Sequence, residues 1–100
     1  MTYTTIQPFG DEQPVAFAGK KPTLKEMQAC VGGFIERVTI KGGEMWVNED
    51  GRALGFPQND VASALAGPVY CWAGPIVGPV LVCRRAARMP KLVEPPQQGA

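Results

Sequence analysis

Residues 23–36, with the sequence TLKEMQACVGGFIE, predict a helix, a glycine stop and the start of a strand in direct succession. Thr23 and Glu26 have the spacing of a capping box, in which each side chain accepts a hydrogen bond from the other residue's backbone N–H. Three apolar residues then follow the helical period: Leu24, Met27 and Val31. Gly32 supplies the left-handed residue that commonly ends a helix. From Phe34 onward the apolar period changes to two, which is typical of a strand.

The segment after this helix predicts a β-hairpin. Side chains alternate over Phe34 to Ile40 and over Glu44 to Asn48, and the diglycine Gly42-Gly43 between them favours a two-residue loop. If both glycines form the loop, paired residues have numbers that sum to 85, so that Glu36 lies opposite Glu49. One face then lines the core: Phe34, Val38, Ile40, Met45 and Val47. The other face carries Arg37, Thr39, Trp46 and Asn48.

The rest of the chain predicts further short elements. We expect strands over Thr2 to Gln7 and Val15 to Ala18. Val69 to Ala73 and Ile76 to Cys83 predict two buried strands or one bent strand. Asn59 is suited to cap a short helix, Asp60 to Ala66, which Gly67 ends. The sum is an α+β fold, with an antiparallel sheet of four to five strands and two short helices on one face. We expect a single domain over residues 1–85 and a flexible, basic, proline-containing tail over residues 86–100.

Composition limits the chemistry and the compartment. One hundred residues suit one hydrophobic core, and the chain has no histidine. Cys30, Cys71 and Cys83 have neither a zinc-site spacing nor the even number of a disulfide framework, so we expect buried thiols in a reducing cytosol. The first residues also lack the basic and apolar regions of a signal peptide. These features predict a cytoplasmic protein.

The run from Val61 to Cys83 has no charged residue and is long enough to span a bilayer. It contains three Gly-Pro pairs, however, and each proline would remove a helix hydrogen bond and clash with the preceding turn. We therefore expect this run to form core, and no membrane partner. The basic run after it, Arg84, Arg85, Arg88 and Lys91, is more typical of a solvated terminus than of a nucleic-acid site.

The predicted hairpin brings two carboxylates, Glu36 and Glu49, close together. Two such charges repel each other unless a cation or a hydrogen-bond donor lies between them, and they therefore predict a ligand site. Trp46, beside Arg37, is placed to stack on a flat ligand such as a nucleobase. The full set of expected ligand-binding residues is Gln28, Glu36, Arg37, Trp46, Asn48, Glu49 and Asn59. Two glutamates without histidine would hold only a weak hard cation, so we expect no metal and no cofactor.

An alternative for the same carboxylates is a structural role. If the register slips, or if both groups lie at a wet sheet edge, the charges of Glu36 and Glu49 only discourage aggregation. The polar pair would then mark no ligand site.

Four short motifs, in this order, resemble one known family. They are L-x-x-M-Q-x-x-V-G-G-x-I-E over residues 24–36, V-N-E-x-G over 47–51, G-x-P-x-N over 55–59 and a closing G-x-V-L-V-like strand over 78–82. Together they resemble the small domain-of-unknown-function family numbered 3846, across roughly residues 20–83. Proteins of this kind occur in phages, plasmids and bacterial genomes, and the family has no settled biochemical activity. The resemblance implies a phage or mobile-element protein.

Three hypotheses about function follow. The leading one is a non-enzymatic binding protein of phage or mobile-element origin that sequesters a nucleotide-derived small molecule and so counters host defence. The alternative is a protein-interaction module that inhibits or adapts a host enzyme, through the face of Trp46 or the apolar C-terminal strands, with homo-oligomers formed along an edge strand. A third is an enzyme with Glu36 and Glu49 as acid and base, for which the sequence offers no nucleophile.

Overall fold

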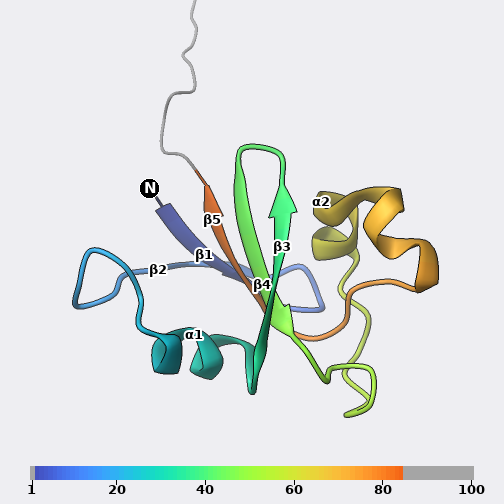
Figure 1. Cartoon of the computed structure of the whole chain (residues 1–100), viewed down its shortest axis with the longest axis horizontal. Coiled ribbons are helices and arrows are strands. Elements are labelled where there is room, and N and C mark those ends of the chain that lie inside the picture. The colour runs from blue at the N-terminus through green and yellow to red at the C-terminus, as the bar shows by residue number, and fades with distance from the viewer. Residues whose placement is uncertain (1, 85–100) are drawn as a thin grey trace, which may run out of the picture.

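A computed structural model describes residues 2–84, which form one five-stranded antiparallel sheet and two α-helices (Figure 1). The strands are β1 (Thr2–Ile6), β2 (Glu12–Val15), β3 (Ile35–Ile40), β4 (Gly43–Asn48) and β5 (Val80–Arg84), in the spatial order β2-β1-β5-β4-β3. The helices are α1 (Leu24–Val31) and α2 (Asp60–Tyr70), followed by a short 3₁₀ helix, η1 (Cys71–Ala73). The predicted α+β class and strand number are confirmed. The tail expected over residues 86–100 lies outside the described residues.

Helix α1 has the predicted ends. The Thr23 hydroxyl accepts from the N–H of Glu26 at 3.1 Å, and the Thr23 N–H donates to the Glu26 carboxylate at 2.7 Å. Gly32 has a left-handed φ of 81°, and its N–H donates to the carbonyl of Gln28 at 2.8 Å. These contacts satisfy backbone groups that a helix leaves open at both ends, so a local sequence pattern fixes where α1 begins and stops.

The predicted hairpin exists, but its register is shifted by two residues. Ile40 pairs with Gly43, and Glu36 pairs with Val47. The expectation that Glu36 lies directly opposite Glu49 is therefore wrong. Because the shift is an even number, every side chain stays on the face predicted for it, and the two glutamates still share one face.

The reason for the shift is the different use of the two loop glycines. Gly42 has a φ of 80° and forms the turn with Lys41. Gly43 is the first residue of β4, and a β-carbon there would overlap the backbone carbonyl of Cys83 in β5. Gly43 must therefore lack a side chain because β5 lies against it, and not because the turn needs a second glycine.

Most of the predicted core face is confirmed. Four of its five residues are buried: Val38, Ile40, Met45 and Val47. Phe34 is 66% exposed, which contradicts the prediction. It lies before β3, in the link from the helix cap, and so does not continue the alternation of the strand.

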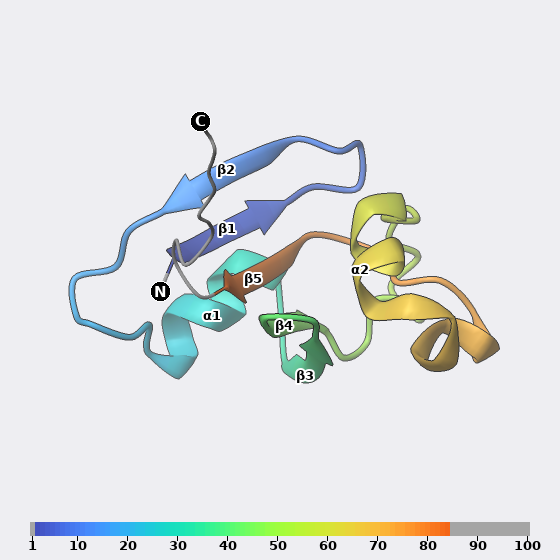
Figure 2. The ribbon, with the colours of Figure 1, turned by 90° about the horizontal axis from the view of Figure 1, so that it is seen from above.

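The two helices lie on opposite sides of the sheet (Figure 2). Val47 packs in the core cluster with Ala62 and Leu65 of α2. The next residue, Asn48, faces the opposite side of the sheet, because side chains alternate along a strand, and it donates to the Val31 carbonyl of α1. The expectation of both helices on one face is wrong. The physical reason is β5, whose residues 80–83 are buried on both faces and need a cover on each side.

Three of the four strands expected outside the hairpin differ from the prediction. Strand β2 covers Glu12–Val15 and not Val15 to Ala18; it includes Pro14, which an edge strand tolerates. The expected strand Val69 to Ala73 is helical, because Gly67, with a φ of 85°, kinks α2 and Pro68 starts a new turn. Of the expected strand Ile76 to Cys83, only the part from Val80 onward forms a strand, which is β5.

No helix within residues 2–84 is long and apolar enough to cross a membrane.

Candidate functional site

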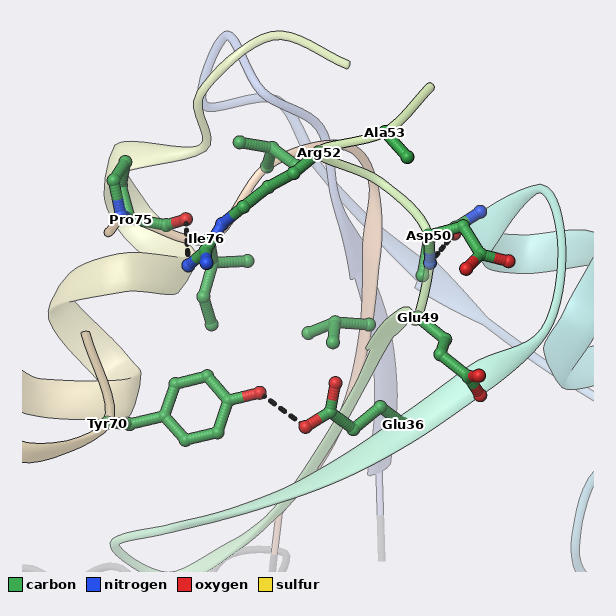
Figure 3. A pocket seen from close by; sticks show the side chains of 11 residues that line it. Glu36, Glu49, Asp50, Arg52, Ala53, Tyr70, Pro75 and Ile76 are labelled. Atoms are coloured by element: carbon green, nitrogen blue, oxygen red, sulfur yellow. Dashed lines mark hydrogen bonds between the residues drawn. The ribbon is translucent and has the colours of Figure 1, made fainter. Parts of the chain in front are cut away.

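A pocket of about 440 Å³ lies between the end of the β3–β4 hairpin and the segment around α2 and η1 (Figure 3). Its floor is apolar and consists of Val47, Ile76 and Val77. Its polar lining residues are Glu36, Asn48, Glu49, Asp50, Arg52 and Tyr70. Three acidic residues and one basic residue therefore line a pocket with an apolar base.

Glu36 and Tyr70 are joined across the pocket. The Tyr70 hydroxyl donates to Glu36 Oε2 at 2.9 Å and thereby links the kinked end of α2 to the edge strand β3 (Figure 3). Burial, together with the hydrogen bond and the charge of Glu36, raises the pKa of Tyr70 to about 12, although Arg52 acts in the opposite direction. Tyr70 is thus a neutral donor, and Glu36 keeps acceptor capacity for a ligand.

The raised pKa of Tyr70 predicts a loss of stability at high pH. The pKa is about 12 in the folded chain and 10.0 for an ordinary tyrosine. The protonated Tyr70 therefore contributes its full share to the free energy of unfolding below pH 10, and this contribution is lost as the pH rises to about 12. We expect the unfolding free energy of the wild type to fall more steeply over this range than that of Tyr70→Phe. Chemical denaturation at a series of pH values measures both curves. Parallel curves would show that Tyr70 does not carry the shift.

The opposite wall is held by Arg52. Its Nη2 donates to the carbonyls of Gly74 at 2.8 Å and Pro75 at 3.1 Å. The next residue, Ile76, is fixed by its N–H, which donates to the hydroxyl of Ser63 in α2 at 2.8 Å. Arg52 therefore directs Nη2 to the protein itself, while its positive charge still acts on Tyr70 in the pocket.

The structure divides the expected site residues between different parts of the molecule. Glu36, Asn48 and Glu49 line the pocket. In Figure 3 the Glu36 side chain points toward Tyr70, whereas that of Glu49 points away from it. The other expected residues lie elsewhere. Arg37 and Trp46 lie on the α1 face of the sheet, Gln28 lies within α1, and Asn59 caps α2.

The two asparagines, Asn48 and Asn59, connect separate elements through side-chain hydrogen bonds to the backbone. Asn48 donates from Nδ2 to the Val31 carbonyl at 3.1 Å and accepts at Oδ1 from the N–H of Asp50 at 2.7 Å. Asn59 has no exposed surface, and its amide contacts three backbone groups: the carbonyls of Ile6 and Gly78 and the N–H of Ala62. The Asn59 amide is therefore directed into the protein and not into the pocket.

The motif glycines also mark close contacts. A β-carbon on Gly33 would lie 2.8 Å from Asn48 Nδ2, and one on Gly51 would lie 2.8 Å from Val77 Cγ2. One on Gly78 would overlap the ring of Phe56. Much of the motif pattern thus encodes contacts between loops. Glu36 and Glu49 are the acidic motif members that line the pocket, and the Glu36 carboxylate is the one that points toward Tyr70 (Figure 3).

The pocket also contains residues that the sequence did not indicate. Tyr70 was expected in a strand, and Arg52 contacts backbone carbonyls that are 22 and 23 residues away in the chain. No sequence pattern signals such contacts. Among residues 2–84, histidine, cysteine, aspartate and glutamate side chains nowhere form a group of three that could hold a metal ion.

The fold and the pocket define a small α+β protein with an acidic, apolar-floored pocket at one end of its sheet. The chain belongs to the family described as "Domain of unknown function (DUF3846)", whose model matches residues 1–97, as the motifs predicted. No curated protein and no protein of known structure matches the chain.

Proposed function

We propose that this protein is a non-enzymatic small binding protein whose ligand occupies the acidic pocket. The observation that carries the proposal is the composition of the lining, in which three acidic residues and one arginine line an apolar floor and the Glu36 carboxylate is directed across the pocket toward Tyr70. A concave apolar surface with a few convergent polar groups is the usual form of a small-molecule site.

The charges select the ligand. Carboxylates accept hydrogen bonds, so they favour a molecule with a cationic or amino group and disfavour phosphates. An apolar or planar body would cover Val47, Ile76 and Val77, and an amino group would reach Glu36 or Glu49. A nucleotide-derived ligand fits this scheme through the amino group of its base, with any phosphate directed to solvent.

Binding without turnover agrees with the side chains at hand. Within the described part of the pocket the lining has no serine, cysteine or histidine that could act as a nucleophile or a neutral-pH base. Tyr70 holds its proton up to about pH 12, which makes it a poor acid near neutrality. Sequestration of a nucleotide-derived signal in a host cytosol, to counter host defence, is the biological role that we propose for such binding.

Thermal denaturation in the presence of a ligand panel tests the proposal. Cytidine and adenosine should each be compared with the matching nucleoside phosphate, and putrescine serves as an amine without a base. A ligand at a hundred times its Kd adds about 2.7 kcal/mol to the stability, which for a domain of this size raises Tm by roughly 10 °C or more. We expect the unphosphorylated amines and nucleosides to raise Tm more than the phosphates do.

Three variants make the panel specific. Glu36→Gln and Glu49→Gln should reduce the shift in Tm, because each removes one charge from the pocket. Glu12→Gln, which changes an exposed carboxylate in the edge strand β2, should leave the shift unchanged. Equal shifts with the phosphates, or an undiminished shift in Glu36→Gln, would contradict the proposal.

One observation favours the alternative, a module that binds a host protein. Trp72, in η1, is 85% exposed, and a large exposed aromatic residue is typical of a protein-binding anchor. The strand β5, by contrast, is buried in the middle of the sheet and is not available to a partner. The outer strands β2 and β3 are the sheet edges along which copies of the chain would associate. A panel without any effect on Tm, together with a host protein retained by the wild type and lost from Trp72→Ala, would favour this alternative.

A further inference from the structure

A second pocket, of about 240 Å³, lies on the other face of the sheet, beneath α1. Its floor is a row of side chains from three neighbouring strands, because Cys83 of β5 pairs with Tyr3 of β1 on one side and with Glu44 of β4 on the other. Trp46 follows two residues after Glu44 and faces the same way. The lining thus includes two aromatic residues, Tyr3 and Trp46, and the thiol of Cys83.

The wall of this pocket is fixed to the floor. It consists of Lys21 and Pro22, which precede α1, and Met27 within the helix. The capping box at Thr23 holds the turn that follows Pro22, and the bond from Asn48 to the Val31 carbonyl fastens the far end of α1 to β4. The pocket is therefore preformed by contacts outside it.

Charge at the rim differs from that of the acidic pocket. Glu44 is paired with Arg37, whose Nη1 lies 3.3 Å from its Oε2, and this is the one ion pair between residues of the described range 2–84. Lys21 is exposed, and within residues 2–84 no carboxylate forms an ion pair with it. Burial, followed by a hydrogen bond with Cys83, raises the pKa of Tyr3, so this phenol adds no negative charge. The lining thus carries one cation, Lys21, and one carboxylate, Glu44, whose charge Arg37 offsets in part.

We propose that this second pocket binds a small molecule that consists of a planar aromatic ring system and an anionic group. The ring stacks on Trp46 and contacts the sulfur of Met27, and the anion lies near Lys21. The volume is below the roughly 300 Å³ at which pockets for drug-sized ligands begin, which limits the ligand to one or two rings. Ring stacking and the opposite charge preference separate this site from the acidic pocket.

Three probes of equal ring size test the proposal: indole-3-acetate, which is anionic, indole, which is neutral, and tryptamine, which is cationic. Each is titrated into ¹⁵N-labelled full-length chain, and the indole Nε1–H signals of Trp46 and Trp72 are followed. We expect a saturable shift of the Trp46 signal, with affinity highest for indole-3-acetate and lowest for tryptamine. Thymidine monophosphate is a fourth probe, and its affinity relative to indole-3-acetate shows whether the site prefers a phosphate or a carboxylate as the anionic group.

Variants separate binding from folding. Trp46→Ala should weaken indole-3-acetate binding about tenfold or more, and Trp46→Phe should restore most of it. Lys21→Gln should reduce the preference for the anion over neutral indole by about two- to fivefold, because an exposed charge acts weakly. Glu12→Gln, which changes an exposed residue that lines neither pocket, should change nothing. Tryptamine binding as tightly as indole-3-acetate, a shift confined to Trp72, or no saturation at millimolar concentrations would overturn the proposal.

Discussion

Replacing Asn59 with alanine will lower the free energy of unfolding by about 3–6 kcal/mol, the sum of a lost helix cap and of two buried carbonyls without a donor. The side chain has no exposed surface and joins β1, the loop before β5 and the start of α2 through bonds of 2.9 to 3.0 Å. Since small domains have only about 5–15 kcal/mol of stability, this variant will be largely unfolded at moderate denaturant.

Urea denaturation of Asn59→Ala measures this loss, and two further variants define its origin. Asn59→Asp keeps the cap acceptor but lacks the amide donors to Ile6 and Gly78, so it should also lose stability. Gln58→Ala removes an exposed side chain next to it, which should cost at most about 0.5 kcal/mol. If Asn59→Ala were as stable as Gln58→Ala, the hydrogen bonds of Asn59 would not hold β1, α2 and the loop before β5 together.

Alanine at Gly43 will cost about 3 kcal/mol or more, because the added methyl group meets backbone that cannot rotate away, a more severe case than overpacking among side chains. Its neighbour provides a matched control. A β-carbon on Gly42 would meet nothing within 4 Å, so Gly42→Ala should cost only the left-handed backbone penalty of about 1–2 kcal/mol.

The difference between these two variants reports the hairpin register. If the turn consisted of both glycines, each would carry part of the backbone penalty and the two substitutions would have similar costs. The observed pairing of Ile40 with Gly43 requires Gly43→Ala to be clearly the more damaging. Guanidinium denaturation of both variants gives the comparison, and equal costs would contradict the register.

The sequence predicts the parts of this fold that depend on neighbouring residues. The capping box of Thr23 and Glu26, the glycine stop at Gly32 and the cap at Asn59 are local patterns, and all three are confirmed. The alternation of β3 and β4 also predicts which side chains face the core, because the side-chain period survives a register shift of two.

Features that depend on distant segments were not predictable in this way. The register follows from the approach of β5 to Gly43, and the placement of the two helices follows from the burial of β5 on both faces. The acidic pocket shows the same division. Glu36 and Glu49 were indicated by the motif, whereas Tyr70 reaches Glu36 only because α2 kinks at Gly67.

The proposed binding role is tested most directly by locating a bound ligand on the protein. Cytidine and putrescine are titrated into ¹⁵N-labelled chain, and the backbone signals of wild type and Glu36→Gln are compared. We predict saturable shifts at Glu36, Glu49, Asp50 and Val77 that weaken in Glu36→Gln. Saturable shifts centred on α1, or none at these four positions at millimolar concentrations, would contradict a ligand site in the acidic pocket.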